Sequence, residues 1–71
     1  MARTSAAQKL GKKIRTLRLE KLLSQEMLGE ITGLDRTYIS GIERGVRNPS
    51  LKNIEKLAKA LDVKVSELTD F

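Results

Sequence analysis

The chain has 71 residues, enough for one small domain with a modest core but too few for a deep active-site cleft or a separate ligand domain. It lacks Cys and His, which excludes disulfides, thiolate metal sites, and the commonest zinc ligand and general base. The net charge of +5 favours a polyanionic partner, although a lysine-rich surface that only aids solubility fits it equally well. We therefore expect a protein that is not an enzyme and that carries no cofactor and no metal.

Membrane insertion and secretion are not expected from the sequence. No apolar run approaches the roughly 18 residues that a membrane-spanning helix needs. The first residues contain no apolar segment like that of a signal peptide. The sequence therefore predicts a cytoplasmic protein without a membrane partner.

The first of five predicted helices runs from about Ala6 to Lys21, and no strand is predicted. Residues 1–5 before it are expected to form a loose N-terminal arm. Apolar residues recur at helical spacing along this helix while basic side chains occupy its other faces. These apolar residues are Leu10, Ile14 and Leu17.

The second helix is predicted to begin after Ser24, a residue type that caps helix N-termini well. Gly29 falls where only a small side chain allows another segment to approach closely. Gly33 is expected to supply a turn with positive φ. The residues expected to face the core are Met27, Leu28 and Ile31.

The third helix is predicted from Arg36 to Arg44, between the cap Asp35 and the stop Gly45. Its inward residues are expected to be Ile39 and Ile42. Its outward residues are mostly small, so this face can press against another surface. They are Arg36, Thr37, Ser40 and Gly41.

The fourth helix is predicted from Leu51 to Leu61 after the cap Ser50, and a short fifth helix from about Val65 to Thr69. The apolar stripe expected on the fourth helix consists of Leu51, Ile54, Leu57, Ala58 and Leu61. The sequence thus predicts one compact all-α domain of five helices spanning residues 1–71.

The second and third helices, joined by a turn at Gly33, have the layout of a helix-turn-helix, whose second helix enters the DNA major groove. The stretch from Leu23 to Leu51 resembles the Cro/cI-type (XRE) helix-turn-helix family. Residues 35–45 look especially like the controller proteins of restriction–modification systems. The resemblance implies a lambda-repressor-like fold and double-stranded DNA as the partner. The matching residues are Ser24, Gln25, Leu28, Gly33, Ile39, Ser40, Ile42, Glu43, Gly45, Arg47, Asn48 and Pro49, followed by Leu61, Asp62, Val63, Glu67 and Leu68.

Three residues depart from the pattern of this family. Gly29 stands where the family usually has Ala, which should weaken the helix by up to about 1 kcal/mol. Leu22 and Asp62 stand where Gly is common. None of the three touches the expected DNA-binding face.

The residues expected to read DNA bases lie on the outward face of the third helix. Arg36 can donate two hydrogen bonds to guanine O6 and N7, and its place near a helix start is otherwise slightly unfavourable. Thr37 can contact a thymine methyl, a base or a phosphate, and Ser40 can reach a base or a phosphate. Gly41 belongs to the same expected face. Because it has no side chain, it is expected to permit a close approach of the DNA rather than to make a contact itself.

Contacts with the DNA backbone are expected from Gln25 and Tyr38, and the resemblance implies backbone and minor-groove contacts for Arg47 and Asn48. Gln25 opens the second helix, where backbone N–H groups attract phosphate, and the resemblance implies a backbone contact for it. For Tyr38, a phosphate or sugar contact and a role in covering a helix junction both fit the sequence. Basic residues of the first helix can supply further phosphate contacts, although a solvated surface is the simpler interpretation. They are Lys12, Lys13 and Arg15.

The resemblance also implies a structural role for Arg18 and Glu43. Their counterparts in the family form a partly buried ion pair between the first and third helices. Such a pair orients the recognition helix, and breaking a deeply buried one costs about 3–5 kcal/mol.

One 71-residue module reads too few bases for tight specific binding, so we expect a homodimer on two half-sites about one helical turn apart. The expected dimer surface comprises the loop before Val65, the last helix and Phe71. The resulting prediction is a sequence-specific transcriptional regulator acting near its own gene, preferably a restriction–modification controller. A phage or mobile-element repressor and an antitoxin-type module that binds a protein remain open. An activator would in addition touch RNA polymerase, for which the sequence indicates no patch.

Overall fold

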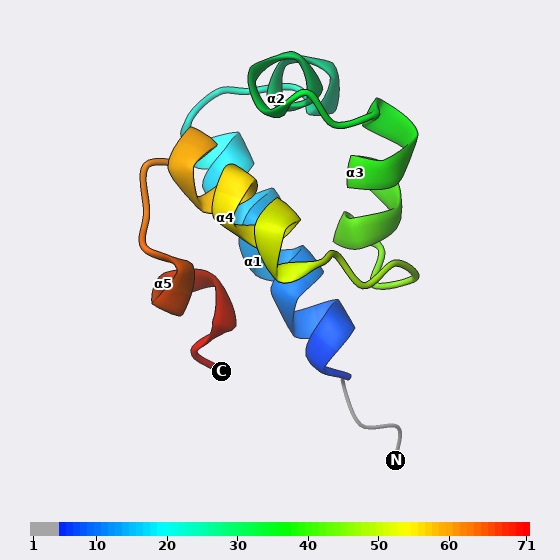
Figure 1. Ribbon diagram of the computed structural model, residues 1–71, viewed down its shortest axis with the longest axis vertical. Coiled ribbons are helices and arrows are strands. Elements are labelled where there is room, and N and C mark those ends of the chain that lie inside the picture. The colour runs from blue at the N-terminus through cyan, green and yellow to red at the C-terminus, as the bar shows by residue number, and fades with distance from the viewer. Residues whose placement is uncertain (1–4) are drawn as a thin grey trace.

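The computed structural model describes residues 5–71, which form five α-helices and no strand. The helices are α1 (Ala6–Glu20), α2 (Gln25–Thr32), α3 (Arg36–Glu43), α4 (Leu51–Ala60) and α5 (Val65–Thr69). The predicted all-α fold is confirmed, and α1, α3 and α4 end one residue earlier than predicted. Figure 1 shows α2 lying across one end of the molecule, with α3 on one side and α5 near the opposite end.

Local side-chain caps explain where the helices begin. The Ser24 and Ser50 hydroxyl groups accept hydrogen bonds from backbone N–H groups three residues on, and Asp35 accepts one from Thr37 N at 2.7 Å. The prediction of a loose arm was wrong at Ser5, because Ser5 and Gln8 form a reciprocal capping box that opens α1. The rest of that arm lies outside the described residues.

The hydrophobic core draws residues from every helix. α1 contacts α3 and α5, α2 contacts α3 and α4, and α4 contacts α5. Burying these apolar side chains supplies most of the favourable folding free energy. The buried apolar residues are Leu10, Ile14, Leu28, Ile39, Ile42, Leu57, Ala58, Leu61 and Leu68.

Three residues predicted to face the core are exposed instead. Met27 and Ile31 are 46% and 57% exposed, because α2 lies across the end of the molecule and buries only Leu28 and Gly29. Leu51 is 65% exposed because it occupies the first turn of α4, whereas the buried residues of this helix, Leu57 and Ala58, lie further along it. Within residues 5–71, no helix has both the length and the apolar character needed to cross a membrane.

Candidate nucleic-acid interface

A short turn fixes α3 against α2. Gly33 adopts φ = 76°, a left-handed conformation that Gly reaches without steric cost. A Cβ atom at Gly29 would lie 2.8 Å from the carbonyl oxygen of Leu34, so the turn packs directly on the α2 backbone. The Thr32 hydroxyl donates to the carbonyl of Leu28 at 2.8 Å and accepts from the Leu34 N–H at 3.2 Å. These contacts produce the helix-turn-helix that the sequence predicts.

The first half of α3 presents a polar surface. Arg36 and Thr37 are exposed and Ser40 is partly exposed. Together with Gln25, at the start of α2, they line one shallow hollow. The structure therefore brings these three α3 side chains and Gln25 to the same surface.

The predicted outward placement of Gly41 was wrong. Gly41 is buried, and a Cβ atom there would collide with the side-chain stem of Arg47. The loop after α3 folds back at this point, because Val46 N and Arg47 N both donate to the Gly41 carbonyl, at 3.0 and 3.2 Å. Gly41 thus supports the loop and adds no side chain to the exposed face.

The other residues predicted to contact the DNA backbone lie around α3. Arg47 and Asn48 are exposed in the loop that Gly41 supports. Tyr38 packs against the core, and its hydroxyl oxygen accepts a hydrogen bond from Asn53 Nδ2 at 3.1 Å. Tyr38 therefore covers the junction between α3 and α4, while its hydroxyl hydrogen is not used in this bond.

Arg18 and Glu43 form a bidentate ion pair, the arrangement that the family resemblance implies. Arg18 Nε lies 2.7 Å from Glu43 Oε2, and Nη2 lies 2.9 Å from Oε1. Arg18 Nη1 also donates to the Leu23 carbonyl at 2.8 Å. The hydrogen bonds that Arg18 donates to Glu43 outweigh desolvation and raise the pKa of the Arg18 guanidinium above its already high usual value. The pair joins α1 to the end of α3.

Gln25 extends this network to α2. Its Nε2 donates to Glu43 Oε1 at 3.1 Å, so the Glu43 carboxylate accepts three hydrogen bonds in all. The start of α2 is thereby tied to the end of α3. One amide hydrogen and the amide oxygen of Gln25 remain for other partners.

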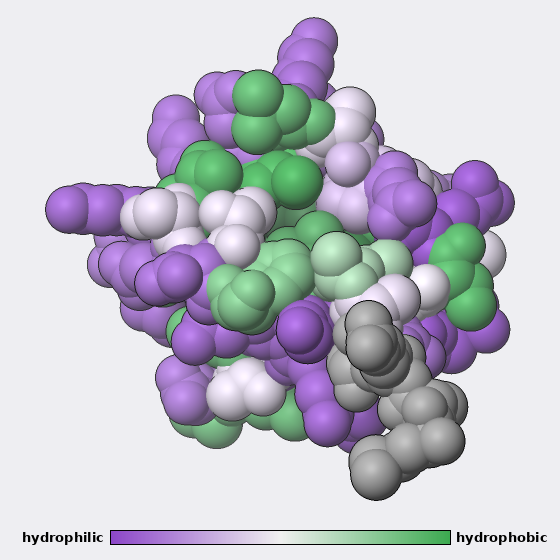
Figure 2. Space-filling view, turned by 90° about the horizontal axis from the view of Figure 1, so that it is seen from below, coloured by the Kyte–Doolittle hydropathy of each residue, from purple (hydrophilic) through white to green (hydrophobic). Residues whose placement is uncertain are grey.

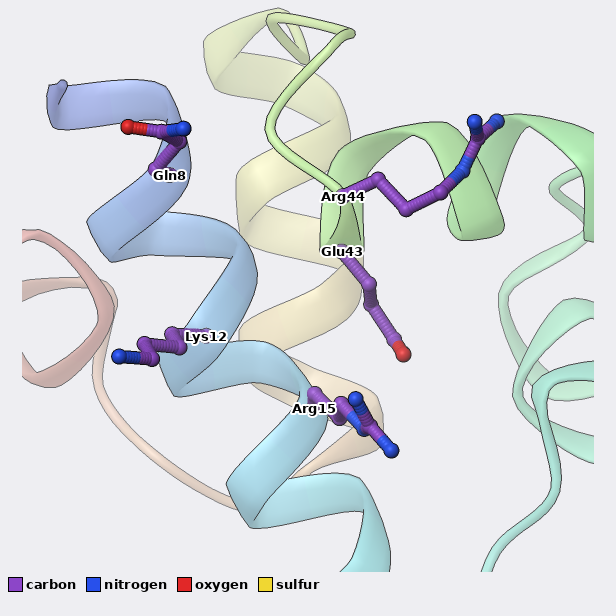
Figure 3. Close-up of a pocket in the computed structure, with 5 residues that line it drawn as sticks. All are labelled: Gln8, Lys12, Arg15, Glu43 and Arg44. Atoms are coloured by element: carbon purple, nitrogen blue, oxygen red, sulfur yellow. The ribbon is translucent and has the colours of Figure 1, made fainter. Parts of the chain in front are cut away.

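A close crossing places basic residues of α1 beside α3. A Cβ atom at Gly11 would overlap the Ile42 carbonyl oxygen and would lie 2.7 Å from that of Glu43. This contact puts Lys12 and Arg15 next to the end of α3. A hollow lies between the two helices, lined by Gln8, Lys12, Arg15, Glu43 and Arg44 (Figure 3). Lys13 does not line it.

No DNA contact was predicted for Arg44 from the sequence. It follows Arg36 and Ser40 at four-residue intervals, and that spacing indicates one face of a helix. Arg44 is exposed and lines the α1–α3 hollow and a neighbouring one shared with Gln25 and Ser40. The polar surface of α3 thus extends from Arg36 to Arg44.

This arrangement suits an anionic ligand. Within residues 5–71, no group of three or more acidic side chains could hold a metal. Exposed guanidinium groups can instead donate paired hydrogen bonds to phosphates or to base edges. The buried ion pair beneath them holds α3 in a fixed orientation.

Comparison with known proteins identifies the family. The helix-turn-helix family pattern matches residues 14–68, which cover most of the chain. The chain belongs to the helix-turn-helix family. This membership confirms the resemblance inferred from residues Leu23 to Leu51. The left-handed turn at Gly33 is consistent with it.

Several members of the family resemble this chain over most of its length. The control protein C.BamHI of Bacillus amyloliquefaciens is 56% identical over 62 residues, covering 86% of this chain and 76% of that protein. The crystal structure of the restriction–modification controller C.AhdI from Aeromonas hydrophila superposes with a TM-score of 0.85 at 55% identity, covering 87% and 94% of the two chains. The controller C.Esp1396I, solved as a tetramer with its natural 35 base-pair operator, gives 0.83 at 40% identity, covering 96% and 90%. All three are control or controller proteins.

Proposed function

We propose that the chain is a sequence-specific transcriptional regulator that binds a two-fold symmetric operator as a homodimer. In this proposal the protein is a cytoplasmic restriction–modification controller that acts on its own promoter region. Residues 1–71 work as one DNA-binding module. The observation that carries this proposal is the exposed face of α3, where Arg36, Thr37 and Ser40 lie beside Gln25. The similarity to control proteins supports it.

Base reading falls to the first half of α3. Arg36 is exposed and can donate two hydrogen bonds to guanine O6 and N7, which contributes about 1–3 kcal/mol of discrimination. Thr37 and Ser40 offer a methyl group and hydroxyls to neighbouring base pairs. Gly41 is buried and has no part in this reading.

Backbone contacts set the register of α3 in the groove. Gln25 holds Glu43 with one amide hydrogen, so its second amide hydrogen is available for a phosphate. Arg47 and Asn48 reach out from the loop beyond α3. The Tyr38 hydroxyl hydrogen can donate to a phosphate while its oxygen still accepts from Asn53.

Dimerisation doubles the number of bases that are read. The proposed dimer surface lies around the loop before Val65, α5 and Phe71. Phe71 is exposed and lies near Lys9, whose ammonium group is 5.8 Å from the ring centroid. Figure 2 shows hydrophobic patches within a mostly hydrophilic surface on the face seen from below. Regulation by activation would in addition require a contact with RNA polymerase.

The proposal is tested by footprinting the DNA immediately upstream of the gene with the purified protein. We expect protection of two half-sites related by a two-fold axis, with centres about one helical turn, roughly 10 base pairs, apart. The complex should contain two chains per duplex in sedimentation equilibrium. Absence of protection, or one chain on a single half-site, would overturn the proposal of a dimeric autoregulator.

A further inference from the structure

We propose that Arg15 and Arg44 form a binding site for one backbone phosphate of the DNA, at the end of α3 opposite to Arg36. The proposal rests on the function proposed above and adds a contact between α1 and the DNA. The site is the α1–α3 hollow, which is lined by none of the residues proposed above to read bases or to contact the DNA backbone.

The length of α3 places this hollow at the edge of the groove. Arg36 is the first residue of α3 and Arg44 is its C-cap, eight residues later, which corresponds to about 12 Å of helix rise. The major groove of B-DNA is also about 12 Å wide. When Arg36 reaches a base edge, Arg44 therefore arrives near the rim of the groove, where the phosphates lie.

The close crossing at Gly11 adds a second arginine to the same place. The backbone of α1 touches the carbonyl groups of Ile42 and Glu43, so Arg15 and Arg44 line one hollow from two different helices. In Figure 3 the Arg15 side chain points toward the Glu43 side of the hollow, and the Arg44 side chain extends along α3. Both are exposed, so rotation about their side-chain torsions can bring the two guanidinium groups onto one phosphate.

The electrostatics of the hollow favour an anion. Its one carboxylate belongs to Glu43, and Arg18 neutralises that group through two hydrogen bonds. Within residues 5–71, neither Arg15 nor Arg44 takes part in an ion pair. Two free guanidinium groups beside a neutralised carboxylate leave the hollow positively charged, and arginine matches phosphate geometry well.

The test is ethylation interference on a DNA site selected by the wild-type protein, compared with the double variant Arg15→Gln/Arg44→Gln. For the wild type, we expect neutralisation of one particular phosphate at the rim of each half-site to reduce binding. The double variant should bind about tenfold or more weakly, with a reduced salt dependence, and should be insensitive to ethylation at that phosphate alone. Arg15→Lys/Arg44→Lys should keep most of the salt dependence.

The control variant is Lys59→Gln, which removes one exposed positive charge from α4, outside the hollow. It should retain the wild-type interference pattern. Circular dichroism and thermal melting will verify that all variants are folded. If the wild type selects a DNA site but the double variant keeps its affinity and its full interference pattern, the phosphate site is wrong while the proposed function stands. If the wild type selects no site, the proposed function itself fails.

Discussion

The guanidinium group of Arg18 and the carboxylate of Glu43 meet in two hydrogen bonds of 2.7 and 2.9 Å inside the protein. Their side chains are only 9% and 3% exposed. The pair joins α1 to α3, and Gln25 connects it to α2. The orientation of α3 therefore depends on one buried polar network.

Removing one partner of this pair should destabilise the fold strongly. Arg18→Met leaves the Glu43 carboxylate buried without its cation, so we expect a loss of about 3–5 kcal/mol in the free energy of unfolding. The double variant Arg18→Met/Glu43→Leu should lose less than Arg18→Met alone, because no uncompensated charge remains. Urea denaturation monitored by circular dichroism measures both. A loss below about 1 kcal/mol for Arg18→Met would contradict the role given to the pair.

The charge of Arg18 should be insensitive to pH under ordinary conditions. Its pKa is raised in the folded protein, so its stabilising contribution is fully present below the usual arginine pKa. That contribution is lost only when the pH rises through the raised value. Between pH 7 and 10 we therefore expect no fall in stability from this group. A fall over that range in the wild type that is absent in Arg18→Met would contradict the pKa direction.

Arg36→Ala should remove the preference for guanine without unfolding the protein. Arg36 is exposed, so its loss leaves the core intact, while the discrimination for guanine should fall by about 1–3 kcal/mol. Competition binding with duplexes that differ at one base pair measures this preference, and non-specific binding should persist. Unchanged discrimination would assign base reading to another residue.

Leu22→Gly should stabilise the protein. Leu22 adopts φ = 58° in the turn after α1, and its side chain is almost fully exposed. A left-handed conformation costs a non-Gly residue about 1–2 kcal/mol, and the greater flexibility of unfolded Gly offsets part of the gain. We expect a net increase of up to about 1 kcal/mol in thermal or urea denaturation. Asp62→Gly, with φ = 57°, should gain less because Asp tolerates this region better.

Gly11→Ala should separate α1 from α3. The added methyl group would overlap the Ile42 carbonyl, and relief requires a backbone shift because no flexible side chain can move away. Such overpacking typically costs about 1–3 kcal/mol. A matched change, Ala6→Gly on the exposed start of α1, should cost less than about 1 kcal/mol. Equal stability of Gly11→Ala and the wild type would contradict the close crossing.

The helix boundaries were predictable from the sequence because they depend on local chemistry. Ser24, Asp35 and Ser50 each cap the helix that follows, and their side chains bond within three residues. The turn at Gly33 was predictable as well, because it depends on the backbone conformation of that one residue. Predictions based on these residues missed the observed helix ends by no more than one position.

Features that depend on the assembled fold were not predictable in this way. The apolar pattern of α2 predicted that Met27 and Ile31 face inward, but the angle at which α2 crosses the molecule exposes both. Gly41 was predicted to face outward together with Arg36, Thr37 and Ser40, yet the loop after α3 folds over it. That Arg15 and Arg44 line one hollow depends on the close crossing at Gly11, which no local pattern encodes. The DNA contacts of the individual residues remain predictions.

The central claim is that this helix-turn-helix protein reads a two-fold symmetric DNA sequence as a dimer. Selection of binding sites from a random pool of DNA duplexes, followed by sequencing, tests it most directly. We predict enrichment of a motif with two inverted half-sites, each containing a guanine. Replacing this guanine should weaken binding by the wild-type protein but not binding by Arg36→Ala. A folded protein that enriches no motif, or only an asymmetric one, would contradict the account.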